Sequence, residues 1–165
     1  MILLVEDDVF FSESVSYYLE AHGKVVLSAY GPDQAVELLN KNGKEITCAF
    51  LDVMMRRGKF FGEIETRGGW HTGLILGSYI KKEYQHIKVY GITASIDEKV
   101  REWFDKFGDG FIRKDPKYIE KTIVQMAEGK VPSKKRWPLD LIDLKPNFYG
   151  LGLNLNALTE RLRKK

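Results

Sequence analysis

Short apolar runs alternate with amphipathic segments through most of the chain, and this rhythm constrains the fold more than any other feature. Continuous apolar runs are typical of strands buried on both faces of a parallel sheet. Apolar residues spaced three or four apart are typical of the helices that cover such a sheet. Strands are predicted over residues 2–5, 24–30, 47–51, 88–93 and 111–113. The alternation predicts an α/β fold, a doubly wound sheet of five parallel strands with helices on both faces.

Several helix boundaries are marked by residues that cap helix ends. Ser95 followed by Glu98 is a capping-box pattern. Asp115 followed by Pro116 is typical of an N-cap and a first helical position. Helices are predicted over residues 10–19, 32–43, 72–84, 95–108 and 116–129.

The composition favours one globular domain and gives no sign of a secreted or membrane protein. The 165 residues are 44% hydrophobic and 30% charged, which is ordinary for a globular chain. Cys48 is the single cysteine, so no internal disulfide can form and we expect a cytoplasmic location. The N-terminal run MILLVEDD lacks the basic start of a signal peptide. No apolar stretch reaches the length of a membrane helix, so no membrane contact is expected.

Residues 56–71 interrupt the alternation with a long glycine-rich loop that has no clear period. Connections in folds of this kind are usually short, so a loop of this length is functional or mobile. Its basic and aromatic residues allow two interpretations: a partner-docking or gating element, or a surface excursion packed by its own aromatics. His71 alone does not indicate a metal site, and we expect it on the surface.

The C-terminal segment differs electrically from the rest of the chain. Residues 129–165 carry nine Lys/Arg against three Asp/Glu, a net charge of +6, which leaves −3 for the remainder of the +3 chain. We therefore divide the chain into a domain over residues 1–128 and a basic, apolar extension over residues 129–165. The extension either folds back on the domain or contacts a partner or a second subunit. It has no motif that reads bases, so nucleic acid is not expected as a ligand.

Polar residues that carry chemistry fall at the carboxyl ends of four predicted strands. Glu6 and Asp7 follow the first strand, Asp52 follows the third, Thr93 ends the fourth, and Lys114 follows the fifth. Ligands of open parallel sheets bind beyond this edge. We expect these side chains to meet there.

These residue types suit phosphoryl transfer with a divalent metal. Clustered carboxylates repel one another and favour a hard cation such as Mg²⁺, bound by Glu6 or Asp7, by Asp52, by a backbone carbonyl and by water. A carboxylate can attack phosphorus once the phosphoryl charge is neutralised. Lys114 would add positive charge and Thr93 a hydroxyl donor.

Four segments resemble the receiver domain of bacterial two-component response regulators: ILLVEDD, FLDVMM, GITAS and DGFIRKD. The resemblance covers about residues 1–128. It implies a flavodoxin-like receiver fold with strand order 2-1-3-4-5, followed by the short C-terminal extension. Each motif is weak alone, and the four together in this order are strong.

The resemblance also implies roles for individual residues. Asp52 would be the phosphoacceptor, with Thr93 and Lys114 contacting the phosphoryl group. Thr93 would also act as a switch residue, together with the aromatic Phe111. The implied Mg²⁺ ligands are Glu6, Asp7, Asp52 and the backbone carbonyl of Met54.

The function implied is a signalling switch rather than an enzyme, with at most self-phosphorylation from small donors and autodephosphorylation. A histidine kinase or phosphotransfer protein would donate the phosphoryl group to Asp52. A downstream protein partner would then read the face formed by the predicted elements 95–108, 111–113 and 116–129. A homodimer could form through the same face or through the C-terminal extension.

The sequence departs from the family pattern at three places near the site. Arg56 and Arg57 stand where the family has a proline after the acceptor. The loop 56–71 replaces a short connection. Asp115 follows the lysine where the family has a proline. These departures concern access to the site and kinase docking, because the residues that would perform the chemistry are all present.

Three alternatives remain open at this point. A Mg²⁺-dependent phosphotransferase or phosphatase of the haloacid dehalogenase type would want a second acid where Met54 stands. A Toprim-like nucleic-acid enzyme would want an Asp-x-Asp pair on the strand that ends at Asp52. The chain could also be a receiver-like scaffold that works without phosphorylation.

Overall fold

The computed structural model describes residues 1–62, 68–94, 98–115 and 119–130. In chain order its elements are β1 (Ile2–Val5), α1 (Val9–Ala21), β2 (Val26–Ala29), α2 (Pro32–Asn42), β3 (Cys48–Asp52), α3 (Thr72–Glu83), β4 (Lys88–Thr93), α4 (Glu98–Lys106), β5 (Gly110–Arg113) and α5 (Ile119–Ala127). The strict alternation of strand and helix agrees with the sequence prediction.

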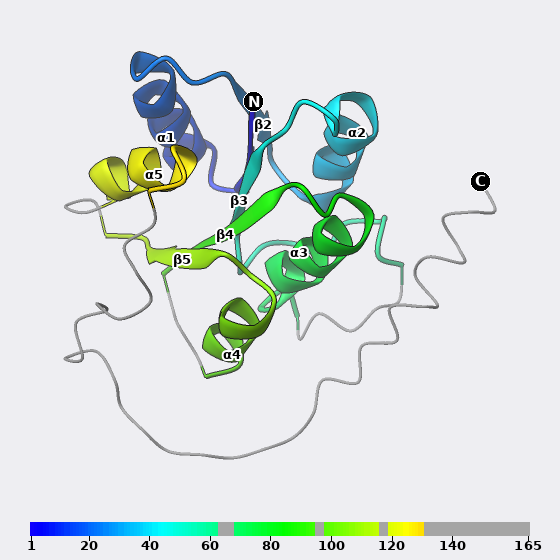
Figure 1. Ribbon diagram of the computed structural model, residues 1–165. Helices are drawn as coiled ribbons and strands as arrows, with labels where there is room; N and C mark the ends of the chain where they lie inside the picture. Colours follow the sequence, from blue (N-terminus) through cyan, green and yellow to red (C-terminus); the bar gives the residue numbers. More distant parts are fainter. Residues whose placement is uncertain (63–67, 95–97, 116–118, 131–165) are drawn as a thin grey trace. The chain divides into compact units, whose positions relative to one another are not determined.

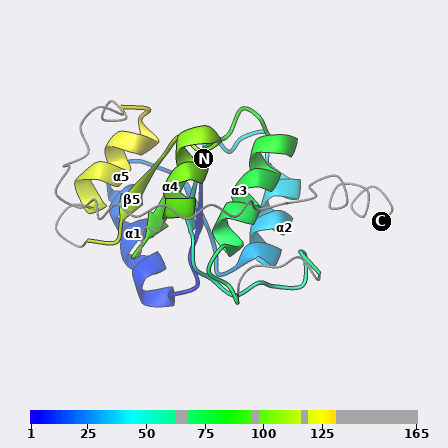
Figure 2. The same cartoon turned by 90° about the horizontal axis from the view of Figure 1, so that it is seen from below.

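The five strands form one parallel sheet in the order β2-β1-β3-β4-β5. This order confirms the predicted doubly wound fold. Helices α1 and α5 cover one face of the sheet, and α2, α3 and α4 cover the other (Figure 1). In the view from below, α1 and α5 lie on one side and α2 and α3 on the other (Figure 2). Because all strands are parallel, their carboxyl ends lie along one edge.

The position of each strand in the sheet explains its burial. Every residue of the central strands β1 and β3 is buried, as continuous apolar runs predict. The edge strand β2 is mostly half-buried and is shorter than the predicted range 24–30. Its flanking residues are used by the neighbouring helices. The Lys24 amide donates to the Leu19 carbonyl of α1, and the Tyr30 amide donates to Gln34 of α2.

Helix α3 begins in direct contact with the end of β3. The Gly73 amide donates to the Val53 carbonyl over 3.1 Å. A Cβ atom on Gly73 would overlap the carbonyl oxygen of Asp52. Glycine at this position therefore lets the helix start against the backbone of the strand that carries Asp52.

Helix α4 is attached to α3 through one tryptophan. Trp103 is 7% exposed, and its indole N–H donates to the Ser78 hydroxyl over 2.9 Å. The indole ring lies against Gly77, where a Cβ would collide with it. Phe104 packs edge-on against the same ring. Because Gly77 has no side chain, α3 leaves room for Trp103, the largest side chain of α4.

Some predictions fall on residues that the structure does not describe. Ser95 and Pro116 lie outside the described ranges, and so do residues 131–165 of the predicted extension. The division between residues 128 and 129 therefore stays a prediction. Among the described residues, no helix combines the length and apolar character needed to cross a bilayer.

Candidate functional site

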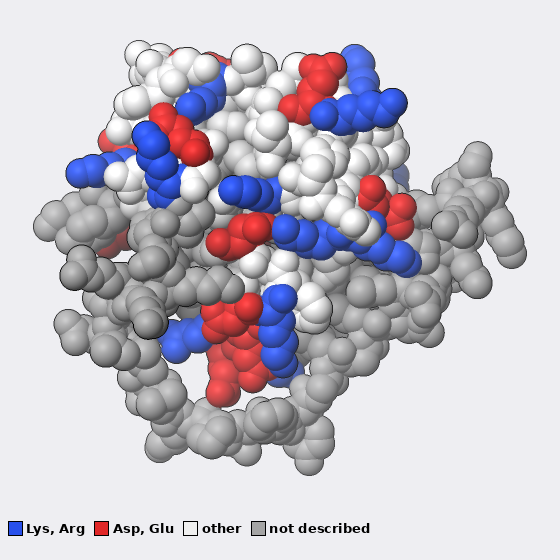
Figure 3. Space-filling view, viewed as in Figure 1, with Lys and Arg blue, Asp and Glu red and all other residues white. Residues whose placement is uncertain are grey.

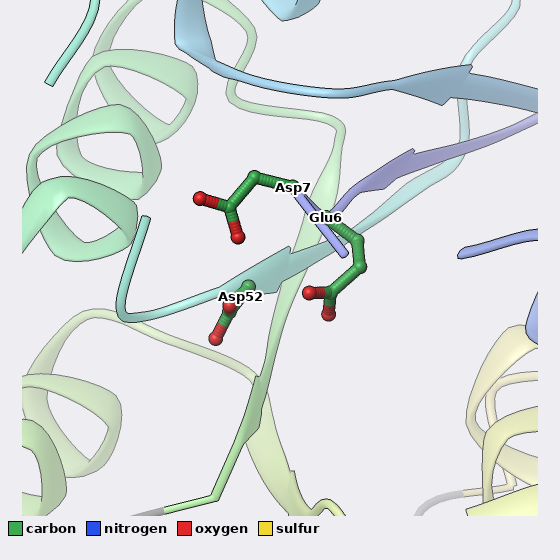
Figure 4. Close-up of side chains that lie close together, drawn as sticks. All are labelled: Glu6, Asp7 and Asp52. Carbon is green, nitrogen blue, oxygen red and sulfur yellow. The ribbon is translucent and has the colours of Figure 1, made fainter. Parts of the chain in front are cut away.

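Three carboxylates gather beyond the ends of β1 and β3 (Figure 4). Glu6, Asp7 and Asp52 each place one oxygen within 4.8 Å of the others. Glu6 is 1% exposed and Asp52 is 3% exposed, whereas Asp7 is half-buried. Glu6 and Asp7 follow β1 directly and Asp52 is the last residue of its neighbour β3, so the sheet itself brings the acids together.

Backbone amides hold the orientation of each carboxylate. The Asp8 amide donates to Glu6 over 3.2 Å, and the Met54 amide donates to Asp52 over 3.2 Å. The Arg56 amide approaches Asp7 at 3.4 Å. The turn after each strand therefore orients the acids without using their remaining lone pairs. Asp8 itself caps α1 by accepting from the Phe11 amide.

Lys114 supplies positive charge to the cluster. Its ammonium lies 2.8 Å from Glu6 Oε2 and 3.0 Å from Asp52 Oδ2. The same ammonium stands 5.0 Å from the centre of the Phe11 ring, a cation–π contact from α1. The Lys114 amide donates to the carbonyl of Thr93, which ties the lysine to the end of β4. Sequence reasoning missed Phe11, because nothing local marks it as a neighbour of residue 114.

Burial and mutual repulsion perturb the acids. Burial, followed by the charge of Asp52, raises the pKa of Glu6 to about 7 in spite of Lys114. Burial also raises the pKa of Asp52, while Lys114 opposes the shift. Burial alone would lower the pKa of Lys114, but its hydrogen bond to Glu6 and the charge of Asp52 raise it. Three carboxylates against one ammonium leave the cluster short of positive charge.

The remaining predicted residues lie on the adjoining strands. Thr93 is fully buried at the end of β4. Phe111 of β5 is 7% exposed and packs against Phe104 of α4, with ring centroids 5.8 Å apart. Met54 is half-buried two residues after Asp52. The roles predicted for these side chains, and for the Met54 carbonyl as a metal ligand, stay predictions.

The described part of the loop after β3 packs against the body of the domain. Phe61 is 1% exposed. Phe60 contacts both Phe61 and Tyr79 of α3 through edge-to-face rings. The surface position expected for His71 is wrong, since His71 is 2% exposed at the start of α3. Gly73, two residues later, brings the start of α3 against the backbone of β3, and this close packing buries His71.

Asp33 is distant from this loop in sequence but holds it through direct hydrogen bonds. The sequence pattern did not reveal this role. Its carboxylate accepts from the Lys59 amide over 2.8 Å and from the Phe60 amide over 2.6 Å. Gly58 has a φ of 71°, and a Cβ there would collide with Asp33. Asp33 lies in the first turn of α2, where the sequence pattern indicates only a helix-compatible acid.

Comparisons with known proteins rest on structure. No family model matches the chain, and no curated protein sequence matches it. The receiver domain of NtrX from Brucella abortus is 23% identical with a TM-score of 0.62, covering 79% of this chain and 98% of that one. The isolated receiver domain of RcsB from Salmonella enterica serovar Typhimurium, solved with a phosphomimetic, is 16% identical with a TM-score of 0.62, covering 80% and 92%.

Longer chains align only in part. A structure of NtrX from Brucella abortus in complex with ADP is 24% identical with a TM-score of 0.61. That alignment covers 79% of this chain and 25% of the NtrX chain, so this chain spans about a quarter of its length. The described part of the chain therefore has the receiver-domain fold of response regulators, the family that its four sequence motifs resemble.

Proposed function

We propose that this protein is a phosphoryl-accepting signalling switch whose acceptor is Asp52. One observation carries the proposal: Asp52 ends a fully buried strand, shares a cluster with Glu6 and Asp7, and is paired with Lys114 at 3.0 Å. A nucleophilic carboxylate needs fixed orientation and nearby positive charge, and both are present around Asp52.

The donor set fits Mg²⁺. Oxygen ligands are available from Glu6, Asp7 and Asp52 within 4.8 Å of one another, and hard cations prefer such ligands. Three carboxylates share one ammonium at this cluster, so a further cation is favourable there. Bound Mg²⁺ would neutralise phosphoryl charge, with the Met54 carbonyl as a further proposed ligand.

The transfer step can be written for a phosphohistidine donor, such as a histidine kinase or a phosphotransfer protein. A carboxylate oxygen of Asp52 attacks phosphorus and forms an O–P bond. The N–P bond of the donor breaks, its electron pair returns to the imidazole nitrogen, and that nitrogen takes up a proton from solvent. Lys114 stabilises the charge that develops on the phosphoryl oxygens.

The output would involve the elements beside the acceptor. Thr93 and Lys114 would contact the new phosphoryl oxygens, and Phe111 would respond through its packing on Phe104. The face of α4, β5 and α5 would shift between two arrangements, and a downstream protein or a second copy of the chain would read it.

Acetyl phosphate provides a direct test. With Mg²⁺ present, wild-type protein should gain the mass of one phosphoryl group, and acetate should be released. Asp52→Asn should abolish this gain, because the amide is not a nucleophile. Asp105→Asn, which changes an exposed acid on α4, should leave it intact. Chelation of Mg²⁺ by EDTA should slow labelling strongly.

An unlabelled wild-type protein, or label that persists in Asp52→Asn, would contradict the acceptor role. Either result would favour a scaffold that works without phosphorylation at this site.

A further inference from the structure

Three cations on the loop after β3 lack an acidic partner among the residues that the structure describes. Arg56, Arg57 and Lys59 are all exposed, and none of them forms an ion pair with any residue in the described part of the chain. Lys24, Lys81 and Lys114, by contrast, each form an ion pair with a carboxylate. On the face shown in Figure 3, groups of acidic side chains lie beside Lys or Arg side chains. The loop is therefore a local excess of positive charge.

The backbone beneath these cations is held in place. The Arg56 amide bonds Asp7, and the Lys59 amide bonds Asp33. Phe61 anchors the far side of the turn in the core. A surface that is already ordered loses little conformational entropy on binding, which favours its use as a docking element.

Arg56, the first of the three cations, stands at the rim of the acidic cluster. Arg56 follows Asp52 by four positions and its amide bonds Asp7, one of the three clustered acids. Trp70 is 56% exposed. It directly follows Gly69, whose carbonyl accepts from the Met55 amide. Arginine and tryptophan are the residues most enriched at the energetic centres of protein interfaces.

The negative charge of the acidic cluster suggests a role for the cations beside it. Three carboxylates face one lysine at the cluster, so an anionic donor is repelled as it approaches. Cations at the rim offset that repulsion and steer an acidic surface toward the acceptor. A small donor such as acetyl phosphate contacts only the cluster. An exposed tryptophan beside the cluster therefore favours a larger donor, such as a protein.

We propose that Arg56, Arg57, Lys59 and Trp70 form a docking surface for an acidic patch beside the phosphohistidine of the donor protein. The inference rests on the proposed function and names the chemistry of its partner. Over residues 56–71 the loop carries four Lys/Arg against two Glu, so its net charge of +2 has the sign that such a partner requires.

Two synthetic peptides serve as probes, each with one phosphohistidine, flanked in one by glutamates and in the other by lysines. Wild-type protein should accept phosphoryl from the glutamate peptide about tenfold faster at low salt, with the difference shrinking as salt rises. The triple variant R56Q/R57Q/K59Q should lose the preference between the two peptides and should still be labelled on Asp52 by acetyl phosphate.

A matched triple variant controls for net charge. K41Q/K44Q/K106Q removes three exposed cations from α2, the turn after it and the end of α4, and it should keep the preference. Trp70→Ala should weaken binding of both peptides equally, since its contribution is apolar. Equal rates from the two peptides in wild type, or an unchanged preference in R56Q/R57Q/K59Q, would overturn the docking surface.

Binding of the unphosphorylated peptides, measured by isothermal titration calorimetry, separates this inference from the acceptor role. If acetyl phosphate fails to label Asp52 but the glutamate peptide still binds more tightly than the lysine peptide, the acceptor role falls and the docking surface stands. If Asp52 is labelled and the two peptides bind equally, the acceptor role stands and the docking surface falls.

Discussion

The acidic cluster and the loop that follows it are neighbours built by different means. The cluster is a product of the sheet, because Asp52 and Glu6 stand at the ends of two paired buried strands. The loop is held by single side chains, chiefly Asp33 and Phe61. The difference separates what this fold supplies from what this chain adds. The fold supplies the carboxylates, and the chain adds a fixed basic rim.

The largest expected effect tests how rigidly the sheet holds the cluster. Gly73→Ala places a methyl group against the carbonyl of Asp52, so α3 must shift away from β3. We expect the free energy of unfolding to fall by about 3 kcal/mol. Urea denaturation measures it. Gly31→Ala is the matched control, because a Cβ there meets open space. Equal losses in the two variants would show that α3 does not constrain the cluster.

A second prediction concerns charge in the cluster. Folding raises the pKa of Glu6 from 4.5 to about 7, so the folded state binds more protons than the unfolded state between these values. In EDTA, the contribution of Glu6 to the free energy of unfolding should be full below about pH 4.5, and about 3 kcal/mol of it should be lost as the pH rises through 7. The raised pKa of Asp52 acts in the same direction.

Glu6→Gln should flatten this pH dependence in urea denaturation at pH 5 and pH 8. Mg²⁺ should stabilise wild type more at pH 8 than at pH 5, because protons compete for the same oxygens. Stability that rises from pH 5 to pH 8 in EDTA would contradict the charge balance described for the cluster.

The smallest expected effect lies in the loop. Asp33→Ala removes the acceptor of two loop amides. The free energy of unfolding should therefore fall by about 1–2 kcal/mol. Hydrogen exchange at Lys59 and Phe60 should speed up, while labelling of Asp52 by acetyl phosphate should stay the same. Asp33→Asn keeps one acceptor oxygen, so its free energy of unfolding should lie between those of wild type and Asp33→Ala. Slower labelling in Asp33→Ala would mean that the loop contributes to the chemistry as well as to docking.

The same division explains what could be predicted from the sequence. The apolar runs that end at Glu6 and Asp52 fix two strands, and parallel strands place their ends together, so the fold and the meeting of the acids followed from local patterns. The contacts of Asp33 with Lys59 and Phe60 span 26 and 27 residues. No periodicity reports such contacts. The burial of His71 likewise depends on the packing of α3 against β3.

The tryptophan that seats α4 on Gly77 gives the molecule a built-in optical reporter. Trp103 is buried at 7% exposure, whereas Trp70 is 56% exposed. A buried indole emits at shorter wavelengths than a solvated one. The chain has a third tryptophan, Trp137, so a variant carrying Trp70→Phe and Trp137→Phe reports the emission of Trp103 alone. Because the same indole N–H is bonded to Ser78, release of α4 would hydrate the ring and redden its emission. The movement of the helix beside β5 can therefore be followed as a change in colour.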